Sequence, residues 1–526
     1  MGGFFMSRRR REKALLMPNT EQLALEGHHK VYSSASPVVD IPRAHILGGA
    51  DPTLHGLVLM KPGAKMPRAS VRHPFFRTIE DDSQVHLDDL VPLYAYNLGP
   101  DELNVPPHFS LTAGSETEVF TLHEEVRNNG HERIQPFWTS HPLEAGLKEL
   151  GIPYSPETWA FMLETNGLAS TSTLERAKDF RRTAKALHQA TELGSGELKF
   201  LPISSQPFEV NPDNINSHPY VQRIVGKYLT FEKTQDLGAS FQVHVEMLDI
   251  NSAIFAVNAL RKIPHLFMAT ALNGPFTQHR YTGLLSAREE GRRRLGTAGN
   301  MPELPEWNEL LERSVTKMQT EPLPSLTRAI SQHSDFRIRP DISPHGTIEF
   351  MFLDNPGGNV DKMLMAQELF RLSTWRLYHA HLDSEDILPI TLFGQDFITQ
   401  NKKAVESMGA DAIVKNGLGN PTTIHSQMAQ LLKWVKHHQS FQDNPEYPFA
   451  HLEAEVQKSL TTPDLSTPTL ASMDRFYQTG IGTPGHYQKA FYEHLRDHGH
   501  SETAAINMTL VNYSDGYHGY ISQLAA

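Results

Sequence analysis

The chain has 526 residues, of which 39% are hydrophobic and 21% are charged, so it has ample material for the core of an ordinary soluble globular protein. Its net charge of −12 argues against general affinity for nucleic acid. It has no cysteine, which excludes disulfides, thiolate metal ligands and a cysteine nucleophile, so any metal must bind to carboxylates, amides, imidazoles or water.

The N-terminal part of the chain shows no long periodic pattern. Four consecutive arginines, Arg8 to Arg11, precede an apolar run that is too short for a secretory signal. No apolar run approaches the roughly 20 residues that span a bilayer. We therefore expect a cytoplasmic protein that binds neither membranes nor nucleic acid. Residues 1–108 are predicted to form an irregular extension of unknown function, with short strands at 55–60 and 91–96.

Regular patterns begin after this extension and mix strands with long helices. We predict strands at 109–123, 159–166, 239–249 and 345–355, and helices at 142–150, 171–194, 251–272 and 359–382. In the third of these helices, Asn251 is the predicted N-cap and Pro264 a bend or break. Residues 383–526 are predicted to be mostly helical, including 396–407, 422–438 and 484–497. The absence of a strict βαβ order favours the α+β class.

The strand at 239–249 has a dry face and a wet face. Alternation places Phe241 and Val243 on one face with the other apolar residues, and Gln242, His244 and Glu246 on the opposite face. One polar triplet of this kind is common on an amphipathic strand that faces solvent. The polar face is therefore informative only together with the other strands.

Other predicted strands also carry acids on one face. Glu116 and Glu118 lie two residues apart, and like charges this close favour a shared cation, although such pairs are also common on solvated strands. Glu164 ends an apolar run. Glu349 interrupts the apolar strand at 345–355 and must be paired if it is buried. Strands of this kind in one sheet would give an acidic surface suited to Mg²⁺ or Mn²⁺, which prefer oxygen ligands and bridge nucleotide phosphates.

Arginines follow in two segments. Arg280, Arg288 and the triplet Arg292 to Arg294 lie in a glycine-punctuated segment at 273–299, and Arg337 and Arg339 precede the strand of Glu349. Positive charge of this kind assists phosphate transfer, whereas for the triplet the alternative is a solvated loop. The P-loop, the dinucleotide-binding fingerprint and the nucleophile elbow of α/β-hydrolases are all absent from the sequence.

The order of these motifs resembles the glutamate–cysteine ligase type 2 family of carboxylate–amine ligases, which is related to glutamine synthetase. The matching segments run over about 110–495 and are GSETEVFTL, SPETWAFMLETNG, LPISSQPF, FQVHVEMLDINSAIFAVNALRKIPHLFMATALNGPFTQHRYTGLLSAR, IRPDISPHGTIEFMFLDNP and GTPGHYQKAFYE. The resemblance implies one catalytic domain at 109–526, built on a curved antiparallel sheet whose concave face holds ATP and metal ions and is flanked by long helices.

The resemblance also implies a reaction and a set of site residues. ATP, with Mg²⁺ or Mn²⁺, would phosphorylate the γ-carboxyl group of glutamate, and an amine would then displace the phosphate; cysteine is the leading amine, as in glutathione biosynthesis. Glutamate and the amine would be the small-molecule partners, and a homo-oligomer is left open. The implied metal ligands are Glu116, Glu118, Glu164, His244 and Glu349. The implied cofactor-binding residues are Gln242, His244, Asn273 and Arg280. The implied catalytic residues, which contact phosphate or the substrate carboxylate, are Arg288 and Arg339.

The chain departs from the family pattern at several positions. Glu246 stands where the family has a small residue after the H-V-H-V strand, and it adds a charge to the site or points outward past it. Gln206 stands where the family has a histidine, and Met351 stands where it has an arginine on the same side of the strand as Glu349. Loss of that arginine removes a cation where a carboxylate or phosphate is expected to bind. Two alternatives therefore stay open: a ligase for another amino acid or amine in a specialised pathway, and a catalytically inactive scaffold that binds a nucleotide or a partner.

Overall fold

The computed structural model describes residues 38–41, 57–60, 111–126, 132–136, 147–193, 198–218, 221–222, 237–294, 303–306, 309–310, 313, 335–339, 346–383, 397–438, 449–465 and 472–525. The predicted strand at 91–96 lies outside the described residues. So does most of the predicted extension at 1–108; within it, the strand predicted at 55–60 is present as β2 (Leu57–Met60), which pairs with β1 (Val38–Ile41).

The main sheet has eight strands, and each strand pair in it is antiparallel. Its strands are β3 (Ala113–Val126), β4 (Glu132–Pro136), β5 (Tyr154–Pro156), β6 (Met162–Asn166), β7 (Leu198–Leu201), β8 (Phe241–Glu246), β11 (Phe336–Arg339) and β12 (Thr347–Phe350). The order is β11-β12-β8-β3-β6-β5, and the long strand β3 also pairs with β4 and β7 at its far end. Two small hairpins, β9 (Phe276–Thr277) with β10 (Arg280–Tyr281) and β13 (Ile413–Lys415) with β14 (Pro421–Thr423), lie apart from this sheet.

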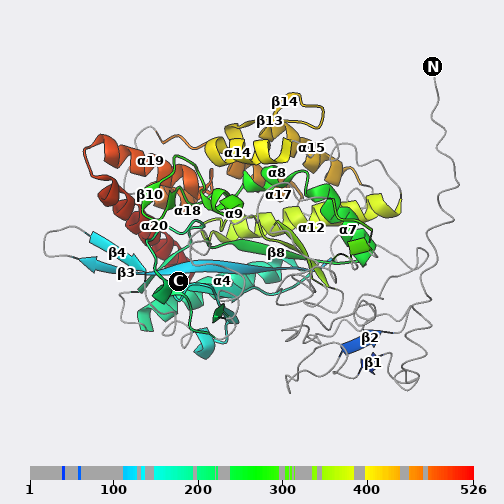
Figure 1. Ribbon diagram of the computed structural model, residues 1–526, viewed down its shortest axis with the longest axis horizontal. Coiled ribbons are helices and arrows are strands. Elements are labelled where there is room, and N and C mark those ends of the chain that lie inside the picture. The colour runs from blue at the N-terminus through cyan, green and yellow to red at the C-terminus, as the bar shows by residue number, and fades with distance from the viewer. Residues whose placement is uncertain are drawn as a thin grey trace.

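Helices, several of them long, flank the sheet (Figure 1). They are α4 (Thr173–Leu193), α7 (Ile250–Leu260), α8 (Pro264–Met268), α9 (Arg288–Arg294), α12 (Val360–Leu382), α14 (Ile398–Met408), α15 (Ile424–Lys436), α17 (Phe449–Leu460), α18 (Ser472–Thr479), α19 (Pro484–Asp497) and α20 (Glu502–Ala525). Two short 3₁₀ turns, η5 (Pro212–Asn214) and η7 (Gly409–Asp411), complete the described elements. The predicted α+β class is therefore confirmed.

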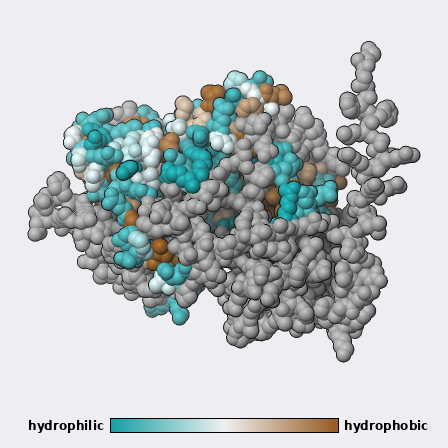
Figure 2. All heavy atoms as spheres, viewed as in Figure 1, coloured by the Kyte–Doolittle hydropathy of each residue, from teal (hydrophilic) through white to brown (hydrophobic). Residues whose placement is uncertain are grey.

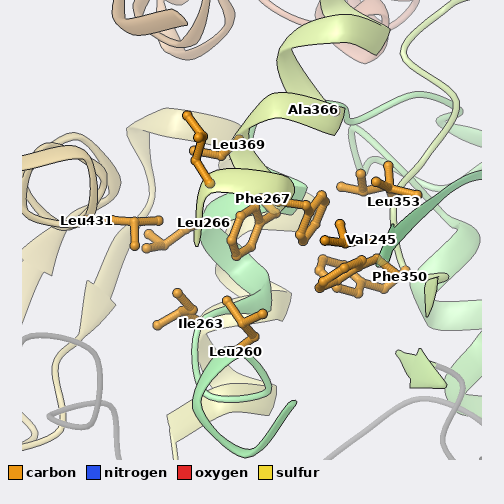
Figure 3. Close-up of a cluster of buried hydrophobic side chains, with 14 of the residues drawn as sticks. Val245, Leu260, Ile263, Leu266, Phe267, Phe350, Leu353, Ala366, Leu369 and Leu431 are labelled. Atoms are coloured by element: carbon orange, nitrogen blue, oxygen red, sulfur yellow. The ribbon is translucent and has the colours of Figure 1, made fainter. Parts of the chain in front are cut away.

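The dry face of β8 forms part of the larger hydrophobic core. Phe241, Val243 and Val245 are fully buried, and the core continues through β12 into α7, α8 and α12. Figure 3 shows Val245 and Phe350 of the sheet facing Leu353 and the side chains of the α8 region, with Leu369 and Leu431 beyond them. The dry face predicted from the alternation is thus the face that anchors the sheet to its helices.

The helix boundaries follow from capping chemistry; at 251–272 the predicted N-cap is wrong, whereas the predicted break at Pro264 is confirmed. The N-cap is Asp249, whose carboxylate accepts from the backbone N–H groups of Asn251 and Ser252, so Asn251 is the second helical residue and not the cap. Pro264 begins the separate helix α8, because its missing N–H is not needed in a first turn. The predicted helix at 359–382 begins after Asn359, which caps α12 through its side-chain oxygen.

The outer surface of the described residues is mixed in polarity. Within the described part of the chain, every helix is too short or too polar to cross a membrane. Figure 2 shows hydrophobic colour at the top of the molecule, where Figure 1 places β13 and β14, among hydrophilic residues. Met408, Ile413 and Leu418 of this region are exposed.

Candidate metal and nucleotide site

One face of the sheet brings the predicted acids into register across three strands. Glu118 of β3 lies directly opposite Glu164 of β6, and Glu116 of β3 lies opposite Gln242 of β8. Directly opposite residues of an antiparallel pair project to the same face. The polar residues predicted separately on each strand therefore form one continuous surface.

The first acidic cluster consists of Glu118, Glu157 and Glu164. Each residue offers a carboxylate oxygen, and these oxygens lie within 4.8 Å of one another. Glu118 and Glu164 are buried, with 6% and 7% exposure, whereas Glu157 is half-buried. The carboxylate of Glu118 accepts from the N–H of Ser240 at 2.6 Å, from the hydroxyl of Ser240 at 2.8 Å and from the amide of Gln242 at 2.7 Å.

Burial and mutual repulsion disfavour the ionised form of the carboxyl groups in this cluster. Burial, followed by the charge of Glu157, raises the pKa of Glu118 to about 8. Burial, followed by the charges of Glu116, Glu157 and Glu118, raises the pKa of Glu164 well above its ordinary value. A divalent cation bound among the three carboxylates would offset this repulsion, and oxygen donors are the ligands that Mg²⁺ and Mn²⁺ prefer.

The second cluster lies beside the first and consists of Glu116, His244 and Glu349. One ligand atom from each residue lies within 4.8 Å of the others, and His244 Nε2 is 3.3 Å from Glu116 Oε1. Glu349 is fully buried directly opposite His244, and Arg337 of β11 lies opposite Glu349 with Nη1 at 3.3 Å from Oε1. The hypothesis that the buried Glu349 is paired is confirmed.

Arg288 approaches the acids from the start of α9. Its guanidinium donates to the backbone oxygens of Met351 at 2.9 Å and Leu353 at 3.3 Å. Burial lowers its pKa, and its charge acts on Glu118 and Asp354. Burial in turn raises the pKa of Asp354 to about 6. Arg288 is therefore a buried cation next to the first acidic cluster, and its predicted contact with phosphate or the substrate carboxylate stays a prediction.

The arginine triplet lies on a helix and not in a solvated loop, and each of its members forms an ion pair. It lies on α9, where Arg292 bridges Glu289 at 2.6 Å and Asp335 at 2.7 Å, and Arg293 forms two hydrogen bonds with Glu406 at 2.5 and 2.6 Å. The third arginine, Arg294, is exposed and pairs with Glu290 on its own helix. Ion pairs with acidic side chains, among them Asp335 and Glu406 from distant segments, thus balance this positive charge.

Two residues predicted to bind the cofactor have other surroundings. Asn273 is fully buried, and its side-chain amide donates to the backbone oxygens of Pro202 and Asn355 and to the Tyr513 hydroxyl, while its oxygen accepts from Gln488. These partners occupy both ends of the amide, so the Asn273 side chain holds loops together, and its role in binding the cofactor stays a prediction.

The second of these, Arg280, is exposed on the β9–β10 hairpin. Its predicted contact with the cofactor stays a prediction. For the predicted catalytic residue Arg339, the structure describes the backbone, which pairs with Thr347 in β11 and β12.

The departures at Gln206 and Glu246 have structural explanations. Gln206 is buried and bonds in both directions to the backbone of Phe208, with its amide donating to the Phe208 oxygen at 2.9 Å, so it closes its own turn. The carboxylate of Glu246 accepts from the backbone N–H of Thr112 at 2.9 Å, next to the start of β3. Neither change therefore alters the acidic clusters.

Sequence reasoning missed Glu157. It precedes β6 in a loop and has no place in an alternating pattern, so strand periodicity has no signal for it. The signal present in the sequence is its position seven residues before Glu164, across the short turn that follows β5. The strand pairing of β5 with β6 brings the loop back to the acidic face.

Comparison with known proteins identifies a protein family whose model matches this chain. The family model described as glutamate–cysteine ligase family 2 matches residues 113–449, well over half of the 526 residues. The match covers the strands that carry both acidic clusters. No curated protein matches the chain in sequence.

Several solved structures are similar over much of the chain. Glutamate–cysteine ligase from Francisella tularensis in complex with AMP has 11% identity and a TM-score of 0.45, and the alignment covers 79% of this chain and 94% of that one. A bifunctional glutathione synthetase from Pasteurella multocida has 10% identity and a TM-score of 0.44, with 79% and 53% covered. A chain in the complex between the prokaryotic ubiquitin-like protein Pup and its ligase PafA has 7% identity and a TM-score of 0.43, with 74% and 69% covered.

Proposed function

The chain belongs to glutamate–cysteine ligase family 2 and is an ATP-dependent ligase, and from this premise we propose that it joins the γ-carboxyl group of glutamate to an amine. A carboxylate oxygen of the acid attacks the γ-phosphorus of ATP and ADP leaves. The amine nitrogen then attacks the carbonyl carbon of the acyl phosphate, forming the amide and releasing phosphate and a proton. We propose that the ligase domain covers residues 109–526, which include the matched residues 113–449.

The observation that supports this proposal is the pair of adjacent acidic clusters on one face of the sheet. Each cluster has three ligand atoms within 4.8 Å of one another. Five carboxylates and an imidazole on one partly buried surface suit hard divalent cations, and such cations neutralise the phosphate oxygens of a nucleotide during phosphate transfer. We assign Mg²⁺ or Mn²⁺ to this surface, with Glu118, Glu157 and Glu164 in one cluster and Glu116, His244 and Glu349 in the other.

Residues of the protein orient the side chains of the site and supply positive charge to it. Gln242 and Ser240 fix the rotamer of Glu118 through three hydrogen bonds, so its carboxylate is positioned before any ligand arrives. Arg288 supplies a buried positive charge beside Glu118, and we assign to it a contact with phosphate or with the substrate carboxylate. We keep the same role for Arg339, from its position in the family motif.

The choice of amine is the finer part of the proposal. Cysteine is our leading candidate, which would make the product γ-glutamylcysteine. Met351 is the observation that favours the second candidate, a related acid or amine, because the half-buried thioether supplies no charge next to Glu349. The inactive-scaffold alternative predicts nucleotide binding without turnover.

The test measures ADP and phosphate release from ATP with Mg²⁺, with and without glutamate, against a panel of amines that includes cysteine. We expect release that requires glutamate together with one amine, and mass spectrometry of the product then names that amine. Removal of the divalent cation with a chelator is the control and should stop release. Absence of release across the panel, with ATP binding still measurable, would support the scaffold alternative instead.

A further inference from the structure

A third group of potential metal-ligating side chains lies away from the two acidic clusters, where α12 meets the end of α15. It consists of His379, Asp383 and His438, and one ligand atom from each lies within 4.8 Å of the others. His379 and Asp383 are four residues apart, so they project from the same face of α12 on successive turns. Asp383 is the C-cap of α12 and still has helical backbone angles, so it continues that face.

The third member comes from a distant part of the chain. His438 lies two residues beyond the end of α15 (Ile424–Lys436), 55 residues after Asp383 in the sequence numbering. Its ring centroid is 4.3 Å from that of His379. Another contact between the same helices, Arg376 of α12 over the ring of Trp434 at 4.6 Å, holds α15 beside α12 (Figure 1).

A buried indole orients both imidazoles. Trp375 is fully buried one turn before His379, and its ring packs edge-on against His379 at 4.5 Å and against His438 at 4.9 Å. The two rings therefore have a rigid support, and the histidines are half-buried while Asp383 is exposed. Ligands held by their surroundings before the ion binds are what a metal site requires.

We propose that His379, Asp383 and His438 bind a divalent transition-metal ion of the Zn²⁺ class. Two imidazoles and one carboxylate are the donors that Zn²⁺ takes at about 2.0–2.2 Å, whereas Mg²⁺ and Ca²⁺ prefer oxygen donors alone. Three protein ligands leave the fourth tetrahedral position to water, which the exposed side of Asp383 admits. The ion would link the C-terminal end of α12 to the end of α15 and stabilise their packing.

This site is chemically distinct from the acidic clusters on the sheet. Those clusters are dominated by carboxylates and suit hard cations, whereas nitrogen donors dominate here. The proposal rests on the geometry of these three residues alone and does not depend on the ligase reaction. The ion's expected effect is on stability.

The test is a titration of the full chain with Zn²⁺ alone as the added probe, after chelator treatment and in the presence of excess Mg²⁺. A chromophoric competitor reports the affinity, and the visible spectrum of Co²⁺ in place of Zn²⁺ reports the coordination number. We expect one tight site in the wild type. His438→Gln and Asp383→Asn should each weaken it by about tenfold or more, since loss of even an outer-shell partner costs about 10–100-fold.

The matched control is His437→Gln. His437 is the neighbouring exposed histidine, and its Nδ1 already contacts the backbone oxygen of Lys433 at 2.7 Å. This variant should bind Zn²⁺ as the wild type does, and it corrects for weak binding to the other histidines among the 28 in the chain.

Melting temperature provides a second readout. Zn²⁺ should raise it for the wild type and His437→Gln and raise it less for His438→Gln, because binding to the folded state alone stabilises that state in proportion to the logarithm of the affinity. Equal Zn²⁺ affinity in the wild type and His438→Gln would overturn the proposal, as would the absence of a tight site in the wild type.

Discussion

Two charged clusters lie close to α9, and they differ in whether the protein balances its own charge. Around α9 and α14, acids and bases alternate in direct ion pairs; the members of this cluster, which we call the balanced network, are Glu289, Arg292, Arg293, Asp335, Lys402 and Glu406. On the sheet face, within the described residues, carboxylates outnumber the arginines Arg288 and Arg337 that accompany them; the members are Glu116, Glu118, Glu157, Glu164 and Glu349.

The pKa values of buried acids reflect this difference. Against the effect of burial, Lys402 and Arg292 hold the pKa of Asp335 below its ordinary value. Burial and Glu157 instead raise the pKa of Glu118 to about 8. A cluster whose charges cancel holds elements together, whereas one left with excess negative charge is suited to bind a cation.

The largest effect expected is on turnover. Glu118→Gln should reduce ATP turnover by about 100-fold or more, because it removes a carboxylate from the centre of the first acidic cluster. Initial rates of ADP release at saturating substrates measure it. Glu246→Gln is the matched control on the same face of the sheet, since a glutamine oxygen still accepts from the Thr112 N–H. Wild-type rates in Glu118→Gln would refute the metal assignment.

Removing one charge should change the free energy of unfolding differently in the two clusters. Lys402→Met in the balanced network should lower the free energy of unfolding by about 3–5 kcal/mol, because it removes one of the two cations, Lys402 and Arg292, that the buried acids Glu289 and Asp335 share. Glu164→Gln should not destabilise the metal-free protein, because it removes one of several repelling charges. Urea unfolding of both variants in a chelator tests this, and an equal loss in the two would contradict the comparison.

A buried lysine with a neutral partner gives a prediction about pH. The ammonium of Lys362 donates to the Ser459 hydroxyl at 2.5 Å, and burial lowers its pKa from 10.5 to about 7. Between these two pKa values the unfolded chain binds more protons than the folded one, so stability should rise with pH by up to about 1.4 kcal/mol per unit.

The test compares the wild type with Lys362→Met. The midpoint of urea unfolding, measured at about pH 7 and about pH 9, should rise more in the wild type than in the variant. Identical pH dependence in the two proteins would show that Lys362 stays charged in the folded state.

The smallest effect concerns the acid substrate. Met351→Arg would add a cation on the side of Glu349, where the sheet face has excess negative charge. If glutamate is the acid substrate, the KM for glutamate should fall by about tenfold, the size of one charge-assisted hydrogen bond. Met351→Leu is the control for the change of side chain, and an unchanged KM would mean that residue 351 does not face the substrate carboxylate.

The acidic face was predictable from the sequence because strand alternation is local. Glu116 and Glu118 lie two residues apart on one strand, so their shared face follows from alternation, and Glu164 ends an apolar run of the next predicted strand. The same holds for His244 and Glu349, whose dry neighbours mark the opposite face. These residues meet as predicted, although their roles with metal and nucleotide are for the proposed experiments to test.

Other residues depend on contacts that no local pattern contains. Arg292 meets Asp335 across 43 positions and Arg293 meets Glu406 across 113, so nothing near the triplet reveals that its charge is occupied. Asn273 is in a motif that resembles a nucleotide contact, but its amide bonds to residues as far away as Tyr513.

The sequence by itself determined the α+β class, the strands and their two faces, and hence the acids available for a metal, because period and capping act over a few residues. The tertiary structure alone decided which charges remain for a ligand. It brought Glu157 to the acidic face, paired Arg292 and Arg293 with acids from distant segments, and placed His438 beside His379. Electrostatic balance is a property of neighbours in space, and the packing of distant segments determines those neighbours.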